Sequence, residues 1–151
     1  MSQRIPKALK QLIREQAVRR CEYCGVHEDD CVLSHRPDHI VARKHGGETV
    51  LENMAWSCFW CNAHKGTDLA SVDPETGRIV RLFGLRRDHW DEHFQIRDGR
   101  IIPLTAIGRV TVRLLQFNRP ETVMSRQYPS TCFGSSFLAF GREWMYSVMS
   151  C

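Results

Sequence analysis

Apolar side chains in the N-terminal segment follow the spacing of an amphipathic helix, at Leu9, Leu12, Ile13 and Ala17. Pro6 stands just before them, and proline is favoured in the first turn of a helix because the N–H that it lacks has no partner there. We therefore predict a helix over residues 6–19. Its polar positions are mostly basic, and Glu15 is the only acid in residues 1–20.

The middle of the chain has no long periodic stretch, so its elements are predicted from turn signals. Residues 32–40 are mixed in polarity and predicted to be extended, and the sequence HGG at 45–47 indicates a turn. Together these features predict a hairpin over residues 32–50. A loop containing Asn53 is expected to follow, and a short helix is predicted over residues 62–69.

Two further hairpins are predicted in the second half of the chain. The sequence DPETG at residues 73–77 indicates a turn between two short apolar segments. Asp98-Gly99 is a strong two-residue hairpin signal between residues 93–97 and 100–104. Both segments are expected to support a core rather than to carry chemistry.

A helix and an atypical tail are predicted to end the chain. Thr105 has the side chain of an N-cap, and the helix is expected to continue to about Phe117. Its apolar face would be formed by Ile107, Val110, Leu114 and Phe117. Residues 127–151 are aromatic, rich in serine and nearly uncharged, without periodicity. We expect this tail to be poorly ordered.

The composition is that of an ordinary soluble domain. The 151 residues suffice for one domain and are too few for two large cores. No stretch reaches the roughly 20 apolar residues of a membrane-spanning helix, and no apolar signal segment begins the chain, so a cytoplasmic location is expected. The net charge of +4 is concentrated in residues 1–20. It favours a nucleic-acid partner only slightly, because a solvated basic helix would look the same.

The cysteines change this picture more than the charge does. Four of the seven form two C-x-x-C pairs, Cys21/Cys24 and Cys58/Cys61. Such pairs, without a secretion signal, indicate metal ligands before disulfides. Four thiolates complete a tetrahedral Zn²⁺ site and leave no open position, so the zinc is expected to be structural. A redox C-x-x-C would need only one pair beside a βαβ pattern, which the sequence lacks.

The residues between and around these pairs carry a family resemblance. The pattern C-x-x-C … D-H-I … G-G … N … C-x-x-C-N-x-x-K over residues 21–65 resembles the HNH endonuclease family in its treble-clef, or ββα-metal, form. A looser resemblance to small bacterial HNH proteins extends over residues 10–126. It implies an α+β fold in four parts: a basic N-terminal helix (1–20), a zinc-stapled nuclease core (21–70), supporting hairpins and a helix (71–126), and the atypical tail (127–151).

The resemblance also implies the roles of four residues. His39 matches the general base and Asp38 matches a ligand of the catalytic cation. Asn53 matches the residue that braces the loop holding the base. Asn62 matches the third motif position, where the family accepts His or Asn as a metal ligand. These roles suit the chemistry, because a neutral imidazole accepts a proton near pH 7 and the oxygen donors of Asp38 and Asn62 suit Mg²⁺ or Mn²⁺.

Each of these residues also has an ordinary structural interpretation. His39 could be a packed histidine, and Asn62 could simply cap a helix. His64 is another candidate ligand, but on a helix it lies about 200° round from Asn62. Basic side chains near the motif could contact the DNA backbone or be merely solvated, namely Arg36, Arg43, Lys44 and Lys65.

The sequence therefore predicts a metal-dependent DNA endonuclease with structural zinc, a catalytic Mg²⁺ or Mn²⁺, and little sequence specificity. The alternative is a non-catalytic treble-clef zinc module that binds nucleic acid or a protein partner. A nuclease serving as a toxin would share the same chemistry. Oligomeric state and recognition sequence are not encoded in any pattern of the chain.

Overall fold

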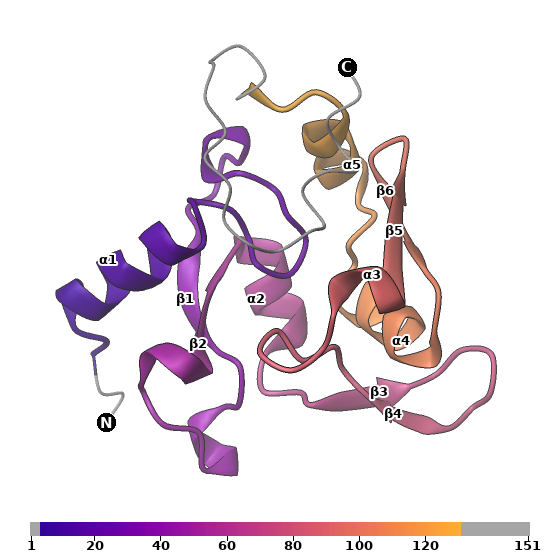
Figure 1. Cartoon of the computed structure of the whole chain (residues 1–151), viewed down its shortest axis with the longest axis horizontal. Coiled ribbons are helices and arrows are strands. Elements are labelled where there is room, and N and C mark those ends of the chain that lie inside the picture. The colour runs from indigo at the N-terminus through magenta and orange to yellow at the C-terminus, as the bar shows by residue number, and fades with distance from the viewer. Residues whose placement is uncertain (1–3, 131–151) are drawn as a thin grey trace.

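The computed structural model describes residues 4–130 and mixes helices with small antiparallel sheets, which confirms the predicted α+β class (Figure 1). The helices are α1 Lys7–Gln16, α2 Phe59–Lys65, α3 Trp90–His93, α4 Ala106–Leu114 and α5 Pro120–Gln127. The strands are β1 Arg36–His39, β2 Met54–Ser57, β3 Ala70–Val72, β4 Ile79–Arg81, β5 Phe94–Arg97 and β6 Arg100–Pro103. Among these residues, each strand pairs with its neighbour in sequence to form a two-stranded sheet. No helix here is long and apolar enough to cross a membrane.

Helix α1 begins at Lys7, one residue later than predicted, and ends at Gln16, three residues earlier than predicted. Val18 and Arg19 have φ angles of 50° and 60°, in the left-handed region that a helix cannot contain. The buried side chain of α1 is Ile13, which packs with Met54 and Trp56 of β2. The helix is therefore fixed to the β1–β2 hairpin.

The hairpin predicted over residues 32–50 is wrong. Strand β1 pairs instead with β2, with Asp38 opposite Ala55 and His39 opposite Met54. The intervening residues 40–53 form a long loop with 3₁₀ turns at Arg43–His45 and Leu51–Asn53. All four residues of β2 are buried, so this strand lacks the alternation that would have marked it in the sequence.

The second half follows the prediction closely. Strands β3 and β4 flank the DPETG turn, and β5 and β6 flank Asp98-Gly99. Thr105 caps α4, because its Oγ1 accepts a hydrogen bond from the N–H of Gly108 at 3.1 Å. Helix α4 ends at Leu114 rather than at Phe117, since Gln116 turns the chain with a φ of 50°. The sequence had not predicted α5.

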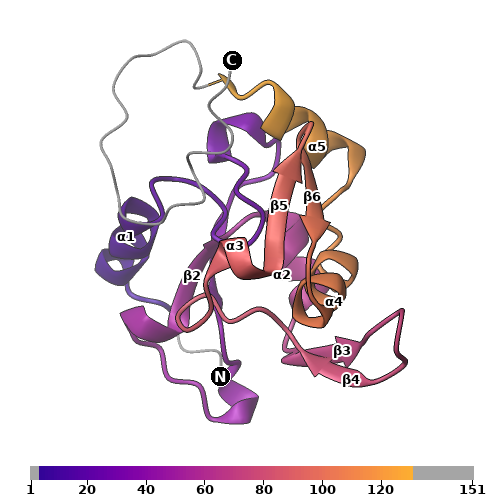
Figure 2. The same cartoon turned by 45° about the vertical axis from the view of Figure 1, so that its right-hand side comes forward.

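One core joins the two halves of the chain. Its buried apolar residues include Val26 beside the first cysteine pair, and Phe94, Val110 and Phe117 from the second half. Figure 1 shows α2 between the β1–β2 hairpin and α4, and Figure 2 shows the β5–β6 hairpin rising from α4. The order of cysteine pair, hairpin, cysteine pair and helix is the one expected of a treble clef, and that finer assignment stays a prediction. Most of the predicted tail, residues 131–151, lies outside the described part.

Candidate active site and metal centre

The four paired cysteines meet in one buried cluster. The Sγ atoms of Cys21, Cys24, Cys58 and Cys61 all lie within 4.8 Å of one another. Cys24 Sγ and Cys58 Sγ are 3.8 Å apart. This separation is about the edge length of a tetrahedron with Zn–S bonds of about 2.3 Å. The cluster could therefore hold a metal such as zinc.

Local backbone geometry turns each cysteine pair toward this centre. The first pair sits in a tight turn that Gly25 closes at φ 79°, and the N–H of Gly25 donates to the carbonyl of Cys21 at 2.8 Å. The second pair opens α2, where Cys58 is the N-cap and Cys61 lies in the first turn. The centre thus joins the start of the hairpin segment to the start of α2.

The chemistry of the cluster also fits a cation. Burial and the neighbouring sulfur atoms raise the pKa of the Cys61 thiol. Four thiolates enclosed together would repel one another without a metal to neutralise them. The buried guanidinium of Arg126 lies close by and donates to the carbonyl of Cys24 at 3.2 Å. Helix α5 therefore contributes a positive charge to the surroundings of the centre.

Strand β1, which packs against α2, carries Asp38 and His39. Neighbouring side chains on a strand point to opposite sides, and the two residues differ accordingly. Asp38 is buried with 8% of its surface exposed, whereas His39 is half-buried. The pair thus presents a carboxylate toward the interior and an imidazole toward the long loop.

The imidazole of His39 is held by one nitrogen. Its Nε2 lies 2.9 Å from Oγ1 of Thr49 in the loop. Nδ1 has no hydrogen-bond partner among residues 4–130. Burial lowers the pKa of His39, the negative charge of Asp38 opposes that shift, and the positive charges of Arg43 and Lys65 add to it. The lowered pKa favours the neutral form of the ring near pH 7, and Nδ1 is the ring nitrogen left without a partner among these residues.

The carboxylate of Asp38 has one engaged oxygen. Its Oδ2 accepts a hydrogen bond from the Tyr23 hydroxyl at 2.8 Å and lies 3.1 Å from Nζ of Lys65. Burial raises the pKa of Asp38, and the nearby Lys65 charge and the Tyr23 hydrogen bond oppose this. Oδ1 has no partner in the described part of the chain. One oxygen thus remains for a further ligand.

Asn53 lies at the base of the loop and ties it together. Its Oδ1 accepts from the N–H of Val41, and its Nδ2 donates to the carbonyls of Val41 and Glu48, each at 2.9 Å. Gly47 lies in the same network, where a Cβ would come within 1.7 Å of the Val41 oxygen. These contacts position the loop that carries Thr49, the partner of His39.

Asn62 and Lys65 lie one helical turn apart on α2, so their side chains share a face of the helix. Lys65 is buried, and its Nζ donates to the carbonyl of His39 at 2.9 Å. Asn62 is half-buried on the same side of α2 as Lys65. Lys65 uses its ammonium inside the protein, which leaves it unsuited to the phosphate contact predicted from the sequence.

The remaining basic residues and His64 lie elsewhere. Arg36, Arg43 and Lys44 are exposed on β1 and the loop. His64 stacks on Trp60 with ring centroids 6.1 Å apart, and Trp60 also lies 3.8 Å from the guanidinium carbon of Arg119. His64 is thus part of an aromatic stack.

Sequence reasoning missed three contributors to this site. Tyr23 lies inside the first C-x-x-C pair, and only the folded chain brings it to Asp38. Thr49 had no motif to mark it. Arg86 donates to the Met54 carbonyl at 2.6 Å and pairs with Glu22 at 2.8 Å, which fixes the second half to β2.

Comparison with known families agrees with the resemblance seen in the sequence. No curated protein and no solved structure is significantly similar to the chain. A family model described as HNH endonuclease matches residues 21–68, which span both cysteine pairs, β1, the loop, β2 and α2. Residues 21–68 of the chain therefore match an HNH endonuclease domain.

Proposed function

We propose that the protein is a metal-dependent DNA endonuclease that hydrolyses phosphodiester bonds. The observation that carries this proposal is the juxtaposition of Asp38 and His39 within the HNH match, with a free Nδ1 on one residue and a free Oδ1 on the other. HNH nucleases act on DNA, and the proposal is supported by a candidate base and a candidate cation ligand at consecutive positions of β1.

His39 is the general base in this proposal. In this proposal His39 adopts the tautomer with the proton on Nε2, so that Nε2 would donate to Oγ1 of Thr49 at 2.9 Å and Nδ1 would be the acceptor. A water molecule at Nδ1 would lose its proton to the ring as it attacks phosphorus. Asn53 supports this step indirectly, because it fixes the loop from which Thr49 orients the imidazole.

Asp38 and Asn62 would hold the catalytic cation. Oδ1 of Asp38 and the amide oxygen of Asn62 are hard donors of the kind that Mg²⁺ and Mn²⁺ prefer. When bound, such a cation neutralises charge on the phosphate and stabilises the leaving oxygen. Position 66, one turn beyond Asn62, is glycine, so the chain supplies few ligands and the cation should bind weakly.

The four-cysteine centre would hold zinc in a structural role. Its four ligands would be buried cysteine thiolates, which fill a tetrahedral shell and leave no open coordination position. Zinc there would complete a treble clef, with the β1–β2 hairpin and α2 placed as the fold requires. Catalysis is assigned instead to His39 as the base and to Asp38 and Asn62 as ligands of the catalytic cation.

DNA is the proposed partner, held through its backbone. Arg36, Arg43 and Lys44 project from β1 and the loop that surrounds His39. Contacts to phosphates carry no sequence information, so little sequence specificity is expected. Lys65 is left out of this set because it is buried against Asp38.

A non-catalytic zinc module is the second candidate. The observation that favours it is the ion pair between Asp38 and Lys65, which already partly neutralises the proposed cation ligand. Such a module would bind nucleic acid or a protein partner without cutting. The same four cysteines would then be its sole metal site.

Incubation of the purified protein with supercoiled plasmid tests the two candidates. With Mg²⁺ or Mn²⁺ the nuclease should convert plasmid to nicked or linear DNA, and with a chelator of Mg²⁺ it should not. His39→Ala is the matched control for a contaminating nuclease. Plasmid binding without conversion under any of these cations would favour the non-catalytic module.

A further inference from the structure

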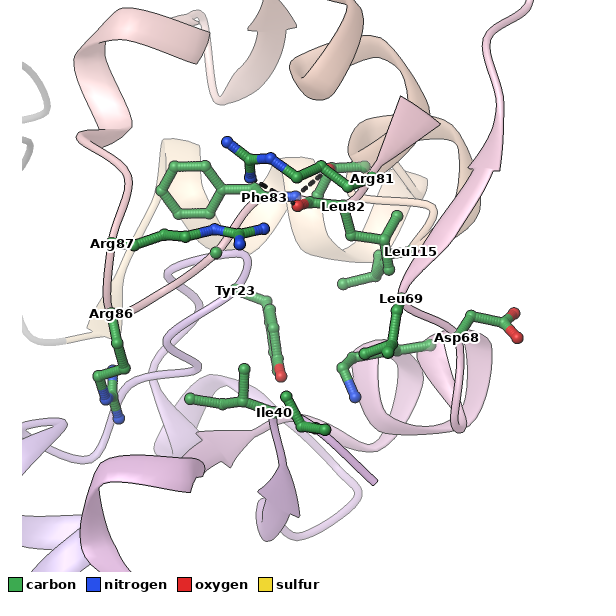
Figure 3. Close-up of a pocket in the computed structure, with 14 residues that line it drawn as sticks. Tyr23, Ile40, Asp68, Leu69, Arg81, Leu82, Phe83, Arg86, Arg87 and Leu115 are labelled. Carbon is green, nitrogen blue, oxygen red and sulfur yellow. Dashed lines mark hydrogen bonds between the residues drawn. The ribbon is translucent and has the colours of Figure 1, made fainter. Parts of the chain in front are cut away.

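A pocket of about 420 Å³ lies between the HNH segment and the second half of the chain (Figure 3). Tyr23, Ile40 and Lys65 line it from the HNH segment, and Phe83, Arg87 and Leu115 line it from the other side. Its volume is that of a small-molecule site. His39 and the four cysteines do not line it, so neither proposed site accounts for this space.

The pocket borders the candidate active site. Tyr23 and Lys65 both contact the carboxylate of Asp38, at 2.8 Å and 3.1 Å, and Ile40 directly follows His39 in the chain. A group bound in the pocket would therefore lie next to the residues that surround the proposed scissile phosphate.

The lining combines apolar walls with a planar aromatic ring. The side chains of Leu69, Leu82 and Leu115 form the apolar part of the wall. Phe83 supplies the aromatic ring and is only partly buried. Figure 3 shows the side chain of Arg87 reaching across the pocket beside the ring of Phe83. Aromatic rings and guanidinium planes are the surfaces on which nucleobases stack.

Arg87 is also the cation best placed to meet an anion. The other cations of the lining form ion pairs within the protein: Arg81 at 2.5 Å, Arg86 at 2.8 Å and Lys65 at 3.1 Å. Arg87 lies 3.8 Å from Asp88, and 61% of its side chain is exposed. A Cβ on Gly84 would lie 2.6 Å from Nε of Arg87, so glycine at that position makes room for this arrangement.

We propose that the pocket receives an unpaired nucleobase of the DNA next to the scissile phosphate, while Arg87 binds the phosphate of that nucleotide. The proposal rests on the proposed function, because the occupant is the nuclease's own substrate. An apolar pocket with one available cation suits a nucleotide, which joins a flat base to an anion. A paired base must first leave the stack at a cost, so substrates with an unpaired base should be preferred.

Binding of two duplexes by the His39→Ala protein tests this proposal. One duplex is fully paired and the other has a single-base bulge, and affinities are measured by fluorescence anisotropy. The bulged duplex should bind about tenfold more tightly, because its base is already unpaired. Leu69→Trp, which fills the pocket, and Arg87→Gln, which removes its cation, should each bring the ratio of the two affinities close to one.

Two control variants separate the pocket from general effects. Val72→Trp is the control for Leu69→Trp, because Val72 is another exposed apolar residue close to Leu69 in the chain. Arg78→Gln is the control for Arg87→Gln, because it removes another exposed arginine. Neither Val72 nor Arg78 lines the pocket. Both should keep the tenfold ratio. Equal affinity of the His39→Ala protein for the two duplexes would overturn the pocket proposal but not the proposed nuclease. An affinity ratio that stays unchanged in both Leu69→Trp and Arg87→Gln would have the same consequence. Failure to bind either duplex would overturn both proposals.

Discussion

The ammonium nitrogen of Lys65 lies 3.1 Å from Oδ2 of Asp38, and only 4% and 10% of the two side chains remain exposed. This ion pair joins α2 to β1 across the centre of the HNH segment. It gives Asp38 a structural partner in addition to its proposed cation, and its contribution can be measured.

Lys65→Met should destabilise the protein by about 3 kcal/mol, because it leaves the Asp38 carboxylate buried without its cation. Urea unfolding followed by circular dichroism measures this change. Lys44→Met, at an exposed site, should change the free energy of unfolding by less than about 0.5 kcal/mol. Adding Asp38→Asn to Lys65→Met should restore part of the loss, since no uncompensated charge then remains. Equal stability of Lys65→Met and the parent would contradict the pairing.

Asn53→Ala should loosen the loop over residues 40–53 without affecting the cysteine centre. The variant loses hydrogen bonds to Val41 and Glu48, and alanine cannot replace any of them. Hydrogen exchange should become faster at the backbone N–H of Val41, which now donates to Asn53 Oδ1. Plasmid cleavage should fall by at least about tenfold, because Thr49 would no longer hold His39 in place. Unchanged exchange at Val41 would show that the loop does not depend on this side chain.

Glu28 should make the fold sensitive to acid. Burial raises the pKa of this carboxyl, but hydrogen bonds from Arg14, Arg19 and Trp56 outweigh burial and lower the pKa to about 2. The pKa in the folded state is thus below its ordinary value of 4.5. The stabilisation is present above pH 4.5 and is lost as the pH falls toward 2.

The difference in melting temperature between the parent and Glu28→Gln, measured from about pH 6 to about pH 3, tests this expectation. The parent should be the more stable protein at pH 6, and the difference should shrink as the pH falls. Glu52→Gln, at an exposed position in the loop, is the matched control and should behave like the parent. A difference that grew toward acid would contradict the lowered pKa.

The sequence was most informative where one local rule decides the structure. Asp98-Gly99 specifies its hairpin and Thr105 its helix cap, because turn and cap preferences act within a few residues. The cysteine pairs likewise have a spacing that indicates one metal centre. The pairing of β1 with β2 could not be predicted in this way. Its partners are separated by a long loop, and β2 is buried on both faces and has no periodic pattern.

For the candidate site, the sequence motif identified Asp38 and His39 as candidates but did not predict the side chains that contact them. Tyr23, Lys65 and Asp38 come from three segments, and their contacts depend on the hairpin that the sequence did not specify. Lys65 is buried because α2 packs against β1 of that hairpin. The pocket beside Phe83 and Arg87 lies between the two halves, so no local pattern in either half could have indicated it.

The cysteine centre should contain about one zinc per chain, measured by elemental analysis of the purified protein. Metal binding by four cysteines is coupled to folding, so removal of the metal with a strong chelator should unfold the HNH segment. Cys58→Ser should lose both metal and fold, whereas Cys31→Ser should keep both, because Cys31 lies outside the four-cysteine cluster. A protein that is well folded without any metal would contradict the structural role.

Metal dependence should separate the roles of His39 and its two neighbours in the proposed active site. His39→Ala should keep the zinc, the fold and most DNA binding but lose cleavage by about 10²–10⁴-fold, the usual cost of removing a general base. Asp38→Asn and Asn62→Ala should also lose cleavage, but they weaken the cation site, so raising Mg²⁺ or Mn²⁺ should recover part of the rate. No such recovery is expected for His39→Ala, since its water would still lack an acceptor for the proton. His64→Ala is the internal control, because His64 stacks on Trp60 and should be dispensable for cleavage. If His39→Ala cleaved plasmid at the parental rate and His64→Ala were inactive, the assignment of His39 as the base would be wrong and His64 would take its place.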